Sequence, residues 1–203
     1  LPGINGQLPY VDVKDDYMIY VGRDGAFFKL DFRDPRHPVK LCDAPRELPP
    51  HGRINRYFTH LTLNHDRTKA FLDLGFEGNN RTWVQGTLDL ATGAFEPWTV
   101  TDFLTNHGQI NPVRDDVALV ASDNCWTLPK AIDLMKLSGW YPRVWIVRRD
   151  GRRELQPIRI GRYATHENWN QDGSGFYWCG NAGVVRQDLE TGAQECVAPR
   201  KAA

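Results

Sequence analysis

Hydrophobic and polar residues alternate over many short stretches of the chain, and turn residues separate these stretches. In the first clear case, a Gly22-Arg23-Asp24-Gly25 turn joins the segment 17–21 to the segment 26–32. A period of two is typical of a β-strand with one buried face, and an Asp-Gly turn between two such runs is typical of a β-hairpin. Almost no stretch has the period of an amphipathic helix. The pattern therefore predicts a protein of short antiparallel strands.

The same combination of strands and turns returns along the chain. We expect strand pairs between the segments 69–74 and 83–90, 117–122 and 144–147, and 175–179 and 184–189. The segment 88–94 (Leu-Asp-Leu-Ala-Thr-Gly-Ala) is also similar to 187–193 (Gln-Asp-Leu-Glu-Thr-Gly-Ala). Internal similarity at a period of roughly 40 to 60 residues indicates a repeated supersecondary unit.

A repeated antiparallel unit of this size is typical of a β-propeller blade. We predict an all-β fold, with about four blades at residues 8–45, 57–100, 107–158 and 166–198 of a single domain, 1–203. Propellers close with about four to eight blades, so we expect these blades to belong to a larger, seven-bladed ring. A closed ring of four blades and a β-sandwich with recurrent Asp-Gly turns are the alternatives. The third unit carries an insertion, 126–140, with a short helical pattern.

Composition and charge exclude several classes of protein. The 203 residues include 25 Lys plus Arg and 25 Asp plus Glu, which gives a formal net charge of zero. A broad positive surface for nucleic acid or an acidic membrane is therefore not expected, whereas a local basic pocket stays open. No apolar run reaches the roughly 18 to 20 residues that cross a bilayer. The seven Trp, seven Tyr and nine Phe agree with β-structure.

The cysteines and one sequon bear on the compartment. Cys42, Cys125, Cys179 and Cys196 are far apart and form no CxxC, which excludes a zinc ribbon or a thioredoxin motif. Disulfides and buried free thiols both stay open. The Asn80-Arg81-Thr82 sequon matters only in a secreted eukaryotic protein. We favour a secreted or periplasmic location over a cytoplasmic one, and the oligomeric state stays open.

Three histidines precede predicted strands at comparable points of successive units. They are His60, His107 and His166, and the polar residues Gln109 and Asn111 follow the second of them. Because the innermost strand of each blade lines the central channel, we expect the three imidazoles to face one site. Histidine acts as a general base near neutral pH or as a metal ligand. The alternative for each is a hydrogen-bonded structural residue.

The segments around two of these histidines resemble a known family. Residues 106–112, the strand 143–147 with its Asp150-Gly151 turn, and residues 165–173 are similar in order and spacing to the "GHxQxxP", "RxW" and "GHEFWxxDG" stretches of oligogalacturonate lyases. These are β-propeller polysaccharide lyases, and related propeller lyases act on ulvan or on rhamnose-glucuronate linkages. The resemblance covers residues 105–179.

The resemblance implies a metal site and a substrate channel. It implies that His166 binds a divalent metal, typically manganese, and that His107 and Gln109 lie in the channel. The family's "CHEGP"-like stretch corresponds here to residues 122–126, Ser-Asp-Asn-Cys-Trp, so that histidine is missing. The family's "QxxHxH" ligands would lie beyond residue 203. The chain therefore departs from the family's full ligand set.

The reaction implied is a β-elimination on a uronic acid in an oligosaccharide or polysaccharide. A base removes the C5 proton, a cation neutralises the adjacent carboxylate, and an acid assists the departing C4 oxygen. We assign the base to His107, the cation to Arg143 or Arg56, and the acid to Tyr57. The alternative for Arg143 is an ordinary blade residue that pairs with a neighbouring carboxylate.

Aromatic residues complete the predicted substrate site. Trp126 and Trp169 are expected to stack on sugar rings, although Trp169 also suits the core of its blade. The further substrate contacts that we predict are His60, Gln109, Asn111 and Arg56. Two other functions stay open. One is a non-catalytic propeller that binds a glycan or a protein on its channel face. The other is a hydrolase, which would need two converging carboxylates, for which Asp123 and Glu167 are candidates.

Overall fold

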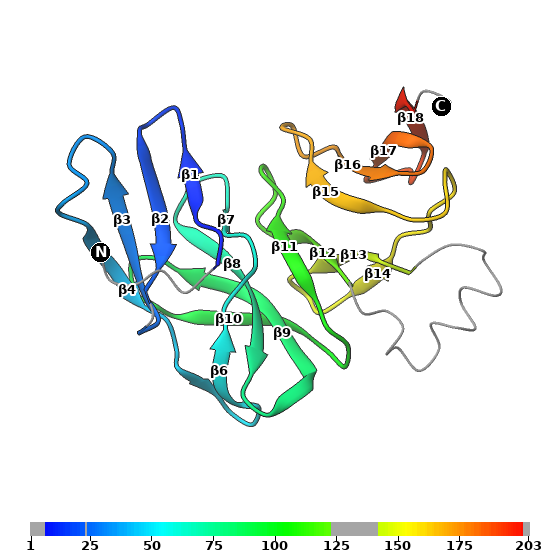
Figure 1. Ribbon diagram of the computed structural model, residues 1–203. Helices are drawn as coiled ribbons and strands as arrows, with labels where there is room; N and C mark the ends of the chain where they lie inside the picture. Colours follow the sequence, from blue (N-terminus) through cyan, green and yellow to red (C-terminus); the bar gives the residue numbers. More distant parts are fainter. Residues whose placement is uncertain (1–6, 23, 123–141, 201–203) are drawn as a thin grey trace.

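The computed structural model describes residues 7–22, 24–122 and 142–200 (Figure 1). Every regular element in these ranges is a β-strand, which confirms the all-β prediction. A helix with the length and apolarity to span a membrane is not found among these residues. The insertion 126–140 lies outside the described ranges.

The first sheet contains four antiparallel strands in sequence order. They are β1 (Tyr10–Asp12), β2 (Tyr17–Val21), β3 (Ala26–Asp31) and β4 (Val39–Asp43). The predicted hairpin is confirmed, because β2 and β3 pair from Tyr17 opposite Asp31 to Val21 opposite Phe27. Gly25, with a φ of 81°, supplies the left-handed turn residue between them.

The second sheet is the largest and has two short strands along its inner edge. Its strands are β5 (Glu47–Leu48), β6 (Gly52–Arg56), β7 (Thr62–Leu63), β8 (Lys69–Phe76), β9 (Asn79–Asp89) and β10 (Phe95–Thr101). The order is β10-β9-β8-β6-β5, and β7 also pairs with β8. The strands β6 and β7 both pair with β8 and follow each other along the inner edge of the sheet. The sheet therefore begins before residue 57, where the second blade was predicted to start. The predicted pairing of 69–74 with 83–90 is confirmed.

The third and fourth sheets repeat the arrangement of the first. The third contains β11 (Asn106–Ile110), β12 (Val117–Ala121), β13 (Val144–Arg148) and β14 (Arg153–Leu155). The fourth contains β15 (Thr165–Trp169), β16 (Gly175–Gly180), β17 (Gly183–Asp188) and β18 (Gln194–Pro199). All their pairings are antiparallel, and both predicted strand pairs are confirmed.

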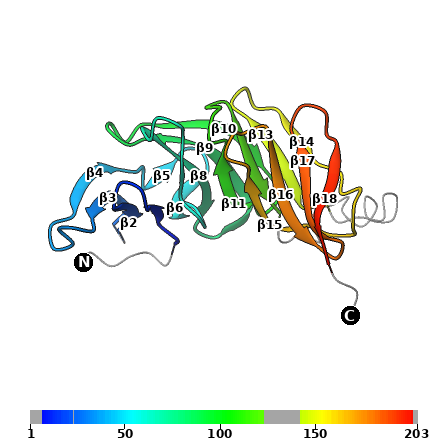
Figure 2. The ribbon, with the colours of Figure 1, turned by 90° about the horizontal axis from the view of Figure 1, so that it is seen from above.

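Apolar side chains fill the three spaces between neighbouring sheets. The strand β12 shows how this is done, since successive side chains point to opposite faces. Leu119 packs with Trp178 of the fourth sheet, whereas Val120 packs with Trp98 of the second. The sheets therefore stack face to face in an arc, with the first and fourth at its two ends (Figures 1 and 2). The chain folds as β-propeller blades, and a larger, seven-bladed ring stays a prediction.

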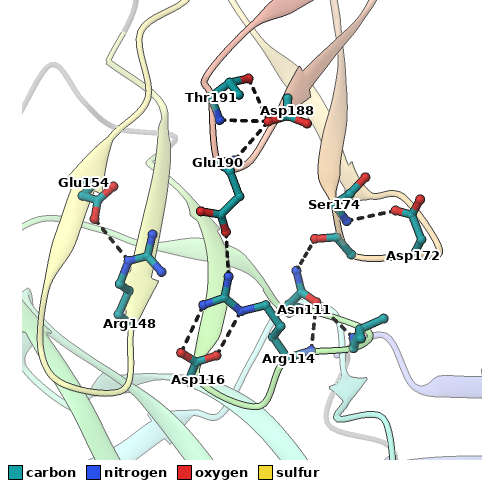
Figure 3. A network of polar contacts seen from close by, with 12 residues as sticks. Asn111, Arg114, Asp116, Arg148, Glu154, Asp172, Ser174, Asp188, Glu190 and Thr191 are labelled. Atoms are coloured by element: carbon teal, nitrogen blue, oxygen red, sulfur yellow. Dashed lines mark hydrogen bonds and ion pairs between the residues drawn. The ribbon is translucent and has the colours of Figure 1, made fainter.

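Polar turns join neighbouring blades at one side of the arc. The amide Nδ2 of Asn111 donates to the Gly173 carbonyl of the fourth sheet at 2.9 Å. Arg114 Nη1 bonds Glu190 Oε1 at 2.9 Å, while its Nε bonds Asp116 at 3.2 Å (Figure 3). The bonds of Asn111 to Gly173 and of Arg114 to Glu190 thus join the third blade to the fourth. Elsewhere, the described cysteines, Cys42, Cys179 and Cys196, are free thiols.

Candidate functional site

The innermost strands of the third and fourth sheets share one distortion. Their pairing register shifts between Asn106 and Gln109 in β11 and between Thr165 and Asn168 in β15. The histidines at these two bulges have left-handed backbones, with φ of 52° at His107 and 54° at His166. Such a conformation is strained for a residue other than glycine, and a bulge redirects a side chain out of the regular strand pattern. The two blades thus present a histidine in the same way.

The three histidines line one pocket of about 160 Å³. The rings of His60 and His107 lie 4.7 Å apart between centroids, at an interplanar angle of 68°. His166 reaches the same pocket from the next blade. The other lining residues are Thr62, Gln109, Glu167 and Asn168. The row of histidines expected from the sequence therefore forms in space, at the inner edge of three successive blades.

Hydrogen bonds between the inner segments hold this pocket together. The backbone amide of His107 donates to Thr59 Oγ1 at 2.7 Å, which ties the third blade to the second. Gln109 Nε2 donates to the Glu167 carbonyl at 2.6 Å, and Trp169 Nε1 donates back to the Gln109 carbonyl at 3.0 Å. The pocket is thus a joint of three blades, and its shape depends on all of them.

Burial keeps two of the imidazoles in their basic form. It lowers the pKa of His107, and the positive charge of Arg143 lowers that pKa further, while Glu167 acts in the opposite direction. Burial also lowers the pKa of His60, with a smaller contribution from neighbouring His107. Since the pKa of histidine is ordinarily about 6.5, both rings are unprotonated at neutral pH. Each can accept a proton or bind a cation.

Arg143 and Glu167 form a buried ion pair beside the histidines. Their side chains are only 8% and 1% exposed. Arg143 Nε bonds Glu167 Oε1, and Nη2 bonds Oε2 at 3.2 Å, so the contact has two points. The structure thus shows the ion pair that was the alternative reading of Arg143. The same pair engages the hydrolase candidate Glu167, whereas Asp123 lies outside the described residues.

Arg56 lies behind the pocket rather than in its lining. Its guanidinium stacks on the Trp83 ring at 4.0 Å. It donates to the Thr105 carbonyl and, at 3.4 Å, to Asp73 Oδ1. Its charge still reaches the site, because Arg56 contributes to lowering the pKa of His107.

The structure does not bring Tyr57 to the histidine pocket. Its hydroxyl donates to the Pro45 carbonyl at 3.2 Å, and its ring meets Phe27 edge to face. The residue belongs to the core between the first and second sheets, where burial raises its pKa. A large aromatic ring gains most by such burial, which explains why this side chain points into the core and away from the channel.

The remaining predicted site residues lie apart from the pocket. Asn111 is fully buried in the turn that joins two blades. Trp169 is half-buried, packs edge to face on Phe176, and lines a separate hollow with Tyr177. Trp126 lies outside the described residues.

Sequence reasoning missed two residues of the pocket lining, Thr62 and Asn168. Each lies two positions after a pocket histidine, as Gln109 does. Residues two apart on a strand share a face. A polar residue two positions after each histidine could therefore have predicted these two lining residues.

A larger groove of about 980 Å³ lies between the first and second sheets. Its lining includes none of the residues predicted for the site. Several of its cations are already engaged, since Arg67 bonds Asp12 and Asp15 and Lys29 lies 4.1 Å from the centroid of the Tyr17 ring. The histidine pocket is therefore the better candidate for chemistry.

The described residues do not fit the manganese site that the family resemblance implies at His166. In the parts of the chain that the structure describes, no group of three or more His, Cys, Asp or Glu side chains is arranged to hold a metal ion. Zinc and manganese sites in proteins are built from at least three such side chains in most cases.

Neither a protein-family model nor a curated protein matches the chain. Solved structures do match. An oligogalacturonate lyase in complex with manganese aligns with a TM-score of 0.68 and 16% identity, over 96% of this chain and 53% of that one. An oligogalacturonate lyase from Vibrio parahaemolyticus aligns with a TM-score of 0.70 and 18% identity, over 95% and 53%.

Proteins with other names share the same blades. TolB from Acinetobacter baumannii aligns with a TM-score of 0.60 and 14% identity, over 95% of this chain and 43% of that one. The β-propeller domain of Myceliophteria thermophila Swd1 aligns with a TM-score of 0.57 and 12% identity, over 98% and 57%. The chain spans about half the length of the lyases it matches. At such identities the likeness shows a shared β-propeller fold.

Proposed function

We propose that the pocket is the proton-abstracting part of a lyase site that cleaves a uronic-acid-containing glycan by β-elimination. The observation that carries the proposal is the meeting of three histidines from successive blades, two of them with a lowered pKa. The likeness to oligogalacturonate lyases supports it through the fold. Pocket and fold together favour proton abstraction from an anionic sugar.

His107 is the general base of the proposed reaction. It takes the C5 proton of the uronate, and the electron pair of that C–H bond forms a double bond between C4 and C5. The bond from C4 to the glycosidic oxygen breaks, and the departing oxygen takes a proton from water that enters beside the exposed His166. The hydroxide that is left takes the proton from His107, which restores the base and the water. A base that is unprotonated at neutral pH is the first requirement of this step, and His107 meets it.

The substrate carboxylate requires a positive field, because charge develops next to it as the proton leaves. Arg143 and Arg56 both lower the pKa of His107, so the field of both cations reaches the base. The same field favours an anionic sugar in the pocket. Both cations are partly balanced, Arg143 by Glu167 and Arg56 by Asp73 at 3.4 Å, so the field at the base is the sum of two partly compensated charges.

The test measures the ultraviolet absorbance of the unsaturated uronate product. The chain is incubated with oligogalacturonate, ulvan and glucuronan fragments, with added manganese and with a chelator. His107→Ala is expected to lower the rate by roughly 10²- to 10⁴-fold, as for loss of a general base. His65→Ala is the matched control, because His65 is exposed in a turn and does not line the pocket. No absorbance change with any uronate under either condition would contradict the proposal.

A non-catalytic glycan-binding propeller is the second candidate. It is favoured by the placement of two assigned groups, since Tyr57 lies in the core and Arg143 is held by Glu167. This reading predicts that the same uronate fragments perturb the histidine resonances of the chain without being cleaved. Binding without product, with His107→Ala retaining the affinity, would select it over the lyase.

A further inference from the structure

A buried acid that the proposed reaction does not use lies behind His107. Asp73, in the apolar strand β8, is fully buried. Its Oδ1 accepts a bond from Arg56 Nη2 at 3.4 Å. Its Oδ2 lies 3.5 Å from the position that a Cβ would take at Gly108, the residue after the base. The carboxyl group thus lies directly against the bulge that carries the imidazole.

Arg56 connects this acid to the segment that leads into the bulge. Its guanidinium, 22% exposed, also donates to the Thr105 carbonyl. The Thr105 hydroxyl in turn accepts a bond from Gln85 Nε2 at 2.6 Å. Thr105 is therefore held through both its backbone and its side chain, two residues before His107. This hold is made from side chains of β6 and β9, outside the sheet to which His107 belongs.

Burying a carboxyl group at position 73 costs free energy of folding, which argues that this group has a specific role. An apolar residue would suit the strand better, because its neighbours Leu72 and Leu74 are fully buried. Burial raises the pKa of Asp73 to about 7, against the opposing effects of Arg56 and of the Gly108 amide. A carboxyl group that titrates near neutral pH beside a base can act on that base.

We propose that Asp73 is the positioning residue for His107: it holds Arg56 against the Thr105 carbonyl, and this contact fixes the bulge that aims the imidazole into the pocket. The effect on catalysis rests on the proposed function, whereas the placement of the ring does not. The charged and titratable groups that face His107 are Arg56 from β6, His60 before β7, Arg143 before β13, and His166 and Glu167 of β15.

The first experiment follows the His107 ring by NMR in Asp73→Asn. Asparagine keeps the shape but loses the charge, so the field of Arg56 is no longer balanced. The pKa of His107 is expected to fall below its wild-type value, with a change in the ring's chemical shifts. Asp12→Asn is the matched control, because Asp12 is also a buried acid and pairs with Arg67 at 2.8 Å, away from the pocket. The control is expected to lose stability and leave the His107 signals in place.

Unchanged His107 signals in Asp73→Asn would overturn the proposal. If Asp73→Asn lowers the stability as Asp12→Asn does, but leaves the His107 pKa and shifts unchanged, Asp73 is only a structural residue. A second measurement needs no variant and covers the case in which Asp73→Asn fails to fold. In the wild-type chain, the His107 chemical shifts are expected to change together with the carboxyl ¹³C titration of Asp73, whose pKa burial raises above its ordinary value. A His107 signal that does not respond to that titration also overturns the proposal.

Turnover separates this inference from the proposed function. In an active chain, Asp73→Asn is expected to lower kcat roughly tenfold with little change in KM, because the base is misplaced while the pocket lining is intact. Asp12→Asn is expected to leave both unchanged. A chain that cleaves no uronate but shows the NMR coupling would contradict the lyase function and support the positioning role. Cleavage of a uronate without the NMR coupling would support the lyase function and contradict the positioning role.

Discussion

Two of the three histidines of this pocket carry backbone strain that regular strands avoid. His107 and His166 both have positive φ, at the same point of adjacent blades. Strain of this kind costs energy and persists where the surrounding structure holds it in place. Its recurrence at two residues that line one pocket indicates that the direction of the side chain matters at this position more than local stability does.

Replacing His107 by glycine and by alanine separates strain from side-chain loss. Glycine relieves the left-handed backbone and alanine does not, so His107→Gly is expected to be more stable than His107→Ala by up to about 1 kcal/mol. Urea unfolding measures the difference. At His65, which is not among the residues of positive φ, the order is expected to reverse by about 0.5 kcal/mol. The same order at both positions would show that the bulge is unstrained.

The pH dependence of turnover follows from the direction of the His107 shift. Protonation removes the base, so kcat/KM is expected to fall as the pH drops through a pKa below 6.5, and to be level above it. Glu167 raises the pKa of His107, so Glu167→Gln is expected to move this acidic limb to lower pH. Rate profiles of the two proteins, with circular dichroism to verify folding, measure the shift. A limb that moves to higher pH would contradict the assignment of His107.

At the scale of elements, one asparagine turn serves each of three inner strands. Asn64, Asn111 and Asn170 each lie four residues after a pocket histidine. Asn64 and Asn111 also reach the next blade, through Asp115 and the Gly173 carbonyl. The side chain of Asn170 bonds Ser174 and Gly175, which belong to its own blade. We therefore expect the asparagine of this turn to contribute less to the free energy of unfolding in the fourth blade, at the end of the arc, than in the third.

Replacing Asn111 and Asn170 by alanine measures how much each contributes to the free energy of unfolding. Asn111→Ala leaves the buried Gly173 carbonyl without its donor and removes the acceptor of the Val113 and Arg114 amides, so a loss of roughly 2 to 3 kcal/mol is expected. Asn170→Ala removes bonds within one turn, and a loss of about 1 kcal/mol is expected. Denaturant unfolding of both variants gives the comparison. Equal losses would show that the bond between blades contributes little.

At the scale of the whole molecule, the blades differ in how many faces they bury. The second and third sheets are covered on both faces, as the buried strands β8 of the second and β12 of the third show. The outward face of the fourth sheet carries Tyr177, the third residue of β16, where β12 has Leu119. Tyr177 is half-buried and Leu119 is fully buried. Equivalent positions thus differ because a neighbouring blade covers only one of them.

Truncating the two side chains tests this difference. Leu119→Ala opens a cavity between two blades and is expected to cost roughly 2 to 5 kcal/mol. Tyr177→Ala leaves no enclosed cavity and is expected to cost about 1 kcal/mol or less. Thermal or urea unfolding measures both. A loss at Tyr177 as large as that at Leu119 would show that something covers this face in solution.

Much of the architecture was readable from local patterns. The alternation of residues 17–21 and the Asp-Gly turns predicted hairpins that the structure contains, because strand period and turn chemistry are encoded by neighbouring residues. The repeat placed His60, His107 and His166 at comparable points, and they line one pocket. The placement of Tyr57 was not readable, since its core partners come from another sheet.

The sequence by itself determined the strands, the repeated blade and the row of histidines. Only the tertiary structure decided the ion pair of Arg143 with Glu167, the left-handed backbone at His107, and the position of Asp73 against Gly108. Both the ion pair and the contact of Asp73 with Gly108 join residues from different blades. Their partners are chosen by how the sheets pack face to face, and no local period in the chain records that packing.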